Sequence, residues 1–240
     1  DQELGRNVQY PLFLRFNGQS WNKIPVNTKN AVYNIYVESE TEVWACGDAG
    51  LVYHFDGLNW DVDTIKVELL ENDIFQLSSI IVMEDRIYVR GVKIIDNGAT
   101  TVDYFFIKES NTWLLKDSFL TDSQNQNYNF GPWFYKSNYN ELYSFGIGGI
   151  YLWNNNNWEN IFYHPSYGVS GMSKQSSKNI LLTSFGGDIY HYNGSNWEEL
   201  KTLRDEEVQY REVWLDDSEA FIIGNVMSDS QAKTIVLHGK

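Results

Sequence analysis

The stretch EVWACGDAGLVYHFDGLNW, residues 42–60, contains the pattern that organises the whole chain. A short apolar run ends in a small residue, a tight glycine-containing turn follows, and a second strand-like run leads through Asp-Gly to a tryptophan. Similar short segments end at five tryptophans spaced 39 to 53 residues apart: Trp21, Trp60, Trp113, Trp158 and Trp197. Recurrence at this interval indicates a repeat architecture.

Each repeat contains four strand-like runs. The second run of each repeat is a short apolar stretch that stops at a small residue, namely Gly47, Gly91, Gly146, Ser184 or Gly224. Such runs are typical of buried strands followed by turns, and glycine supplies the positive φ that tight hairpins need. Further strand-like stretches precede them, at 31–37, 74–83, 129–135, 167–173 and 208–215. With no helical periodicity, the pattern predicts an all-β chain, a β-propeller with four-stranded antiparallel blades.

The two ends of the chain predict how the propeller closes. The first tryptophan has no strands before it in its repeat, and the last apolar run has no tryptophan after it. We therefore predict one domain, 1–240, in which the N-terminal strand completes the last blade and covers its open edge. The five expected blades are 31–66, 74–118, 128–162, 167–202, and 208–240 plus 20–26. Either 10–16 or 234–238 forms the third strand of the last blade.

Charge and composition exclude several classes of partner. The formal net charge is −14, which disfavours nucleic acid and anionic membrane surfaces. No apolar run reaches the roughly 18–20 residues of a membrane-spanning helix. The single cysteine, Cys46, lies inside an apolar run and is expected to be a small buried hydrophobe. We expect a monomer.

The stretch 42–60 resembles the repeat of bacterial envelope and secreted propellers, which are described as photosystem-assembly-factor-like or BNR-like. The resemblance covers the first, third and fourth blades and, less well, the fifth; the second has lost the turn and the Asp-Gly pair. It implies an extracytoplasmic protein that is secreted, periplasmic or surface-anchored through a removed N-terminal segment. It implies no activity. The sialidase box S-x-D-x-G-x-T-W differs, because here Asp56 directly precedes Gly57.

Chemical motifs are sparse. His54 and His191 share one repeat position, which favours a structural role, and His164 precedes a proline in an expected turn. The histidines lack metal-ligand spacing. Asp61 and Asp63 alternate on one strand, but two carboxylates are too few for calcium. We therefore predict neither a metal nor a cofactor.

The innermost strands carry the most unusual residues. Aligning them places five residue pairs in register: Tyr33-Asn34, Ser78-Ser79, Gly131-Pro132, Val169-Ser170 and Arg211-Glu212. Because these strands line the axial channel of a propeller, we predict a ligand site at its mouth. Its residues are Tyr33, Asn34, Ser79, Trp133, Tyr210, Arg211 and Glu212. The alternative is an internal salt link that fills a narrow channel.

Three functions fit these observations. The first is a non-catalytic binding propeller that recognises glycan or protein at the cell envelope, through aromatic platforms and a few polar groups. The second is a glycan-processing enzyme, a glycoside hydrolase or sialidase-like protein. It would need two carboxylates about 5–9.5 Å apart, such as Glu212 with Asp216 or Glu207. The third is a purely structural scaffold for protein interaction.

Overall fold

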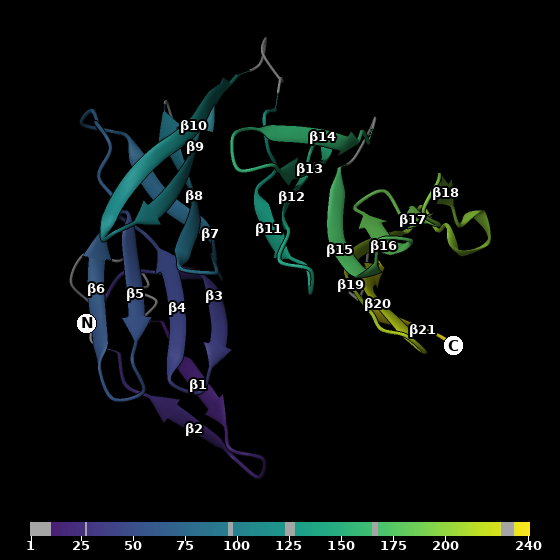
Figure 1. Cartoon of the computed structure of the whole chain (residues 1–240), viewed down its shortest axis with the longest axis horizontal. Coiled ribbons are helices and arrows are strands. Elements are labelled where there is room, and N and C mark those ends of the chain that lie inside the picture. Colours follow the sequence, from purple (N-terminus) through teal and green to yellow (C-terminus); the bar gives the residue numbers. More distant parts are fainter. Residues whose placement is uncertain (1–10, 27, 96–97, 123–127, 165–167, 227–232) are drawn as a thin grey trace. The chain divides into compact units, whose positions relative to one another are not determined.

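The computed structural model describes residues 11–26, 28–95, 98–122, 128–164, 168–226 and 233–240. The described chain consists of antiparallel strands and one short 3-10 turn, η2 (Lys201–Leu203). It forms two compact units, Asp1–Asn125 and Gln126–Lys240, which are described separately (Figure 1). No helix in this part of the chain is long and apolar enough to cross a membrane.

The first unit contains two four-stranded sheets, here numbered one and two. Sheet one has the order β3 (Val32–Ser39), β4 (Glu42–Gly47), β5 (Leu51–Phe55), β6 (Trp60–Thr64). Sheet two has the order β7 (Ile74–Met83), β8 (Arg86–Ile95), β9 (Thr100–Glu109), β10 (Thr112–Thr121). In both, neighbours in sequence are neighbours in the sheet, as expected for repeats of four hairpin-linked strands.

The second unit contains sheets three, four and five. Sheet three has the order β11 (Trp133–Lys136), β12 (Leu142–Gly146), β13 (Gly149–Trp153), β14 (Trp158–Phe162). Sheet four has the order β15 (Val169–Ser176), β16 (Asn179–Ser184), β17 (Ile189–Tyr192), β18 (Trp197–Glu199). Sheet five has three strands, β19 (Val208–Leu215), β20 (Ala220–Val226) and β21 (Lys233–Gly239).

The predicted strand plan is confirmed in most of its details. The third strand of sheet one spans Leu51–Phe55, and three outer strands begin at Trp60, Trp158 and Trp197. Sheet two differs, because β8 continues through Gly91 to Ile95. Without a glycine turn after Gly91, the hydrogen-bonded ladder with β9 extends along both strands.

The core lies between successive sheets within each unit. In the first unit, β3 and β4 pack on β7, and the buried cluster includes Cys46, Val52, Leu77 and Val89. Cys46 is fully buried as predicted, and burial raises the pKa of its thiol. In the second unit, one cluster joins sheets three and four and another joins sheets four and five. Sheet four therefore packs on both of its faces, which is why its strands are so apolar.

The N-terminal segment forms a hairpin of its own in the first unit. β1 (Phe13–Phe16) pairs with β2 (Trp21–Ile24), and the Phe13 ring lies 5.0 Å from the Trp60 ring. The third strand of sheet five is β21, which pairs with β20 from Lys233 to Gly239, so 234–238 takes that position. Residue 10 lies outside the described residues. The closure of the last blade by the N-terminal strand stays a prediction.

Candidate functional site

β-Bulges occur in four of the innermost strands. An extra residue interrupts the register at Tyr33 in β3, Ser78 in β7, Ser170 in β15 and Arg211 in β19. A bulge turns a side chain out of the regular alternation and is common beside binding sites. The bulge lies at the first residue of the aligned pair in three sheets and at the second residue, Ser170, in sheet four. Sequence reasoning missed the bulges themselves; the polar or small residues that break the apolar pattern were their signal.

In the first unit, the predicted site residues form contacts within the protein. The Tyr33 hydroxyl donates a hydrogen bond to Asp48 Oδ1 at 2.8 Å and accepts one from Gln76 Nε2 at 3.1 Å. Burial, together with the Asp48 carboxylate, raises the pKa of Tyr33 to about 12. The Asn34 amide oxygen accepts the backbone N–H of Ile80 at 3.1 Å, which joins sheets one and two. Ser79 is buried. Of the three, only Tyr33 is substantially exposed.

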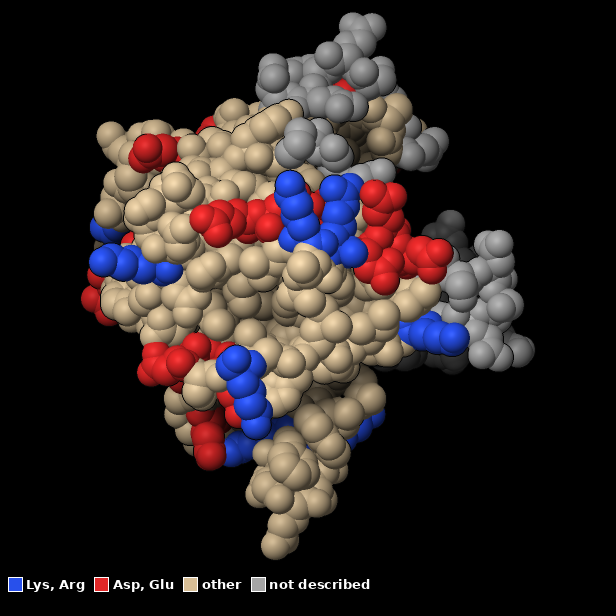
Figure 2. Space-filling model, turned by 90° about the vertical axis from the view of Figure 1, so that its right-hand side faces the viewer, with Lys and Arg blue, Asp and Glu red and all other residues tan. Residues whose placement is uncertain are grey.

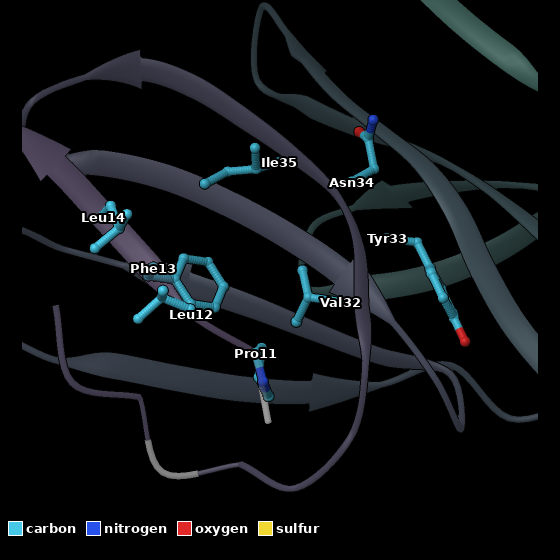
Figure 3. A pocket seen from close by; sticks show the side chains of 8 residues that line it. All are labelled: Pro11, Leu12, Phe13, Leu14, Val32, Tyr33, Asn34 and Ile35. Atoms are coloured by element: carbon cyan, nitrogen blue, oxygen red, sulfur yellow. The ribbon is translucent and has the colours of Figure 1, made fainter. Parts of the chain in front are cut away.

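A cavity of about 500 Å³ lies between β1 and β3 in the same unit (Figure 3). Its lining consists of Pro11, Leu12, Phe13, Leu14, Val32, Tyr33, Asn34 and Ile35. Figure 3 shows the Tyr33 side chain pointing away from the β1 side chains. None of the eight lining residues is charged, and Tyr33 is the one titratable side chain among them.

In the second unit, the structure brings together an aromatic pair and an arginine. Trp133 of sheet three lies with its ring centroid 5.7 Å from that of Phe185, and the Arg211 guanidinium carbon of sheet five lies 5.1 Å from the same Phe185 ring. Arg211 Nη2 donates to Gln209 Oε1 at 2.6 Å. We call Trp133, Phe185 and Arg211 the aromatic–arginine platform. Sequence reasoning missed Phe185, whose place directly before the Gly186-Gly187 pair of a turn was the available signal.

The platform has the chemistry of a binding surface. Trp133 is 37% exposed, and Arg211 is also exposed. Aromatic faces attract planar or apolar groups, and a guanidinium held over a ring offers directed donors for a carboxylate or a hydroxyl. Three consecutive sheets each contribute one member, so a ligand lying on the platform would contact all three.

Tyr210 and Glu212, the remaining predicted residues, do not join the platform. Tyr210 is 2% exposed, and its hydroxyl donates to the Leu203 carbonyl at 2.9 Å. Glu212 Oε1 accepts the backbone N–H of Val213 at 3.1 Å. No ion pair between Arg211 and Glu212 occurs in the described part of the chain, so the internal salt link is not formed by this pair.

The environment of Glu212 predicts a pH dependence of stability. Burial raises the pKa of its carboxyl, although the Val213 N–H opposes the shift. A carboxyl whose pKa is higher in the folded state than in the unfolded state binds its proton more tightly in the folded protein. Its contribution to stability is complete below the unfolded-state pKa of about 4.3 and is lost as pH rises through the folded-state pKa. We expect Glu212→Gln to raise the free energy of unfolding at pH 7 by less than about 1 kcal/mol, because the carboxyl keeps solvent contact. Urea unfolding at pH 4 and pH 7 tests this; an equal effect at both values would contradict it.

The carboxylates considered for glycan hydrolysis are well separated along the backbone of β19. Glu207 precedes β19 and Asp216 follows it, five and four residues from Glu212. At about 3.3 Å per residue these separations are about 16 Å and 13 Å along the strand. Asp216 accepts the N–H groups of Ser218 and Glu219, which hold the pKa of its carboxyl below the usual range. Both backbone separations exceed the roughly 5–9.5 Å between the two carboxyl groups of a glycosidase.

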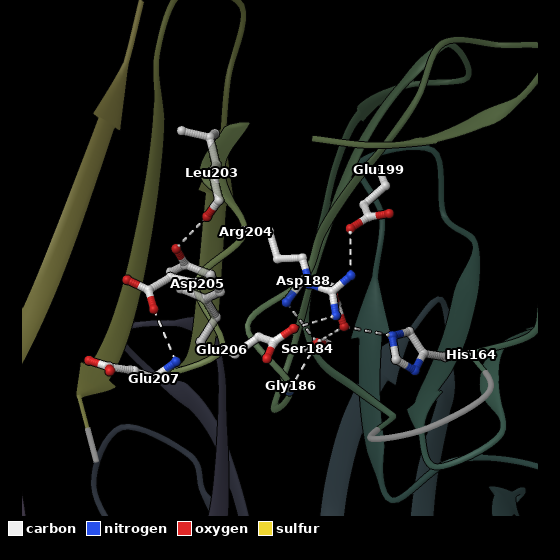
Figure 4. A network of polar contacts seen from close by, with 11 residues as sticks. His164, Ser184, Gly186, Asp188, Glu199, Leu203, Arg204, Asp205, Glu206 and Glu207 are labelled. Carbon is white, nitrogen blue, oxygen red and sulfur yellow. Dashed lines mark hydrogen bonds and ion pairs between the residues drawn. The ribbon is translucent and has the colours of Figure 1, made fainter. Parts of the chain in front are cut away.

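His164 occupies a buried polar network rather than a simple turn (Figure 4). It is 4% exposed, and burial lowers the pKa of its imidazole although nearby Asp188 opposes the shift. Its Nε2 lies 3.5 Å from Asp188 Oδ2, and Ser184 Oγ donates to the same oxygen at 3.0 Å. The carboxylate therefore lies between serine and histidine. A hydrolytic triad instead needs the histidine between serine and carboxylate.

The other histidines link strands within their sheets. His54 Nε2 lies 2.8 Å from Glu42 Oε1, and His191 Nε2 lies 2.9 Å from Asn179 Oδ1. Asp63 binds Lys108 Nζ at 2.6 Å. Among the described residues no group of three or more His, Cys, Asp or Glu side chains could hold a metal ion. These contacts are structural links between strands or sheets.

Charges of both signs are interspersed on the face drawn in Figure 2. Most of the basic side chains there lie next to acidic ones, with uncharged surface between the groups. This arrangement lacks the continuous basic surface that phosphate backbones require.

The geometry can be compared with known proteins. No protein-family model matches the sequence, and no curated protein sequence is similar to it. Among solved structures, YCF48 from Cyanidioschyzon merolae is similar at a TM-score of 0.57 and 14% identity, over 89% of this chain and 74% of that one. YCF48 bound to D1 peptide is similar at 0.59 and 15%, over 93% and 74%.

A receptor domain is also similar. The extracellular domain of the hybrid two-component system BT4673 from B. thetaiotaomicron matches at a TM-score of 0.57 and 11% identity, over 93% of this chain and 30% of that one. Identities this low establish the fold alone. The chain thus has a β-propeller fold like that of the YCF48 photosystem assembly factor, in agreement with the resemblance seen in its repeat.

Proposed function

We propose that this chain is a non-catalytic, extracytoplasmic binding propeller that recognises a protein segment or a glycan at the cell envelope. The observation that carries the proposal is the aromatic–arginine platform. There the exposed Trp133 ring, the half-buried Phe185 ring and the exposed Arg211 guanidinium come together from three successive sheets. Binding propellers use such loops and strand ends as ligand sites.

A protein segment is the favoured ligand class. One structural neighbour holds a D1 peptide and another is an extracellular domain, which supports both the ligand class and the location. A glycan remains the second candidate, because sugars also stack on rings such as Trp133. The carboxylate spacing described above argues against an enzyme that cleaves the glycan.

The predicted seven-residue site divides into two roles in this proposal. Trp133 and Arg211, together with Phe185, contact the ligand on the second unit, and Tyr33 is a separate exposed ring of the first unit. Asn34, Ser79, Tyr210 and Glu212 support the strands that carry these side chains. This division follows from their burial and their backbone hydrogen bonds.

We expect Trp133→Ala and Arg211→Ala each to weaken ligand binding about tenfold or more, because central aromatic and arginine side chains dominate binding energies. Calorimetric titration with a D1 peptide tests the protein class, and a glycan array tests the other. Trp214→Ala is the matched control. Trp214 is 51% exposed and lies on the same strand as Arg211, but it is not part of the platform.

The outcomes separate a binding propeller from a structural scaffold. Peptide binding that both platform variants lose supports the proposal. If a ligand is found and both folded variants bind it as the wild type does, the platform is the wrong site. If neither the D1 peptide nor any glycan binds, the scaffold alternative gains support.

We further propose that residues 1–240 form one monomeric, five-bladed ring, in which 20–26 complete the last blade. Sheet five has three strands, with Trp214, Ile223 and Val236 exposed. A three-stranded last sheet with an open edge is what the out-of-phase repeats predict. The deletion experiment in the Discussion tests this closure.

A further inference from the structure

Phe185, the central member of the platform, lies in the turn between β16 and β17, Ser184–Asp188. Ser184 Oγ accepts the backbone N–H groups of Gly186 and Asp188, both at 3.1 Å, and donates to Asp188 Oδ2 at 3.0 Å. Ser184 is 1% exposed and Asp188 7%. At Gly187, with φ of +83°, a Cβ would come within 1.9 Å of the Asp205 carbonyl oxygen. Side chains and backbone together restrict the turn to one conformation.

Asp188 also joins this turn to the segments on either side of sheet four. His164, which follows sheet three, lies 3.5 Å from Oδ2, and Arg204 Nε, which precedes sheet five, lies 3.3 Å from Oδ1 (Figure 4). Arg204 is held in turn by Glu199 at 3.3 Å and Glu206 at 3.1 Å. A single buried carboxylate therefore connects elements of three successive sheets.

The platform draws its members from the same three sheets. Trp133 comes from sheet three, Phe185 from the turn of sheet four, and Arg211 from sheet five. Phe185 is the common neighbour of the other two. A movement of the Ser184–Asp188 turn would change both contacts, because both are made with the Phe185 ring.

We propose that Asp188 is the positioning residue of the aromatic–arginine platform: it clamps the Ser184–Asp188 turn and thereby places Phe185 between Trp133 and Arg211. The inference rests on the proposed binding function for its biological meaning. Its physical basis is preorganisation, since a platform already held in its bound geometry loses less freedom on binding.

A ligand-free measurement tests the placement of Phe185. The Arg211 guanidinium lies over the Phe185 ring, so its NMR signals carry a ring-current shift that Phe185→Leu removes. We expect Asp188→Asn, which keeps the side-chain shape, to move the Arg211 signals most of the way to their positions in Phe185→Leu. Ser184→Ala should move them in the same direction. Arg211 signals unchanged in both folded variants would overturn the proposal.

Lys174→Met provides the matched control. Lys174 is 5% exposed and binds Glu141 Oε2 at 2.5 Å and the Tyr143 hydroxyl at 2.7 Å, so it too is a buried charge that joins neighbouring sheets. It lies toward the other end of β15, away from the platform. We expect Lys174→Met to lower stability and leave the Arg211 signals in place. An Arg211 shift as large as that of Asp188→Asn would mean that general loosening, rather than the clamp, moves Phe185.

Binding of the D1 peptide supplies the second arm. We expect Asp188→Asn alone to weaken peptide binding about tenfold relative to the wild type. Added to Phe185→Ala, the same substitution should have almost no further effect, because the clamp acts through the Phe185 ring. Full additivity of the two substitutions would overturn the proposal. If the wild-type protein does not bind the peptide, the ligand class in the proposed function fails, and the NMR arm still decides the role of Asp188.

Discussion

Replacing Trp158 with alanine is expected to lower the free energy of unfolding by about 3–5 kcal/mol, the usual cost of truncating a buried tryptophan. Trp158 is 8% exposed, and its ring lies 5.3 Å from Trp153 and 5.8 Å from both Phe130 and Phe134. The substitution would leave a cavity among three aromatic rings that cannot close it without moving strands. Chemical unfolding monitored by far-UV circular dichroism measures the loss.

Trp21 provides a control at the same repeat position. It is 67% exposed, and its described ring contact is with Phe16 at 5.2 Å. Trp21→Ala should therefore cost less than about 1 kcal/mol, as exposed substitutions do. Equal losses for Trp158→Ala and Trp21→Ala would show that the repeat position, rather than burial in this structure, determines the cost.

Deleting residues 1–26 is expected to remove most of the hydrogen-exchange protection of β21 and to lower the stability of the whole domain by several kcal/mol. In the proposed ring, the N-terminal strand completes the last blade, so its loss would expose the β21 edge to water. Hydrogen exchange read peptide by peptide distinguishes this effect from a local one.

The local effect is also defined by the structure. Phe13 packs on Trp60, so the deletion should loosen β6 in any case. The substitution Phe13→Ala serves as the control, since it removes that contact and retains β2. If the deletion lowers protection in β6 and leaves β21 as protected as in Phe13→Ala, the closure by residues 20–26 is wrong.

The strand plan was predictable because it depends on local chemistry. Apolar runs of strand length, bounded by glycine turns and an Asp-Gly or Asn-Gly pair, specify hairpins whatever the rest of the chain does. Leu51–Phe55 and the outer strands at Trp60, Trp158 and Trp197 follow directly from this pattern. The longer β8 departs from the prediction, because a single residue such as Gly91 cannot end a strand without a turn after it.

The candidate site was predictable only in part. Sequence alignment of the innermost strands found Trp133 and Arg211, because a large aromatic and a charge stand out where the repeats are otherwise apolar. It also selected Asn34, Ser79 and Tyr210, which the structure uses for internal contacts or burial. Residue type shows which side chains can bind a ligand, but not whether a neighbouring sheet already occupies them.

The repeat, the four-strand unit and the propeller fold could be predicted from the sequence, because each arises from patterns within about 50 residues. Only the tertiary structure decided that Phe185 joins Trp133 to Arg211, and that His164 and Arg204 meet at Asp188. These contacts join residues from different sheets. Their geometry depends on how sheets twist, bulge and pack on one another, and no local periodicity in the sequence encodes it.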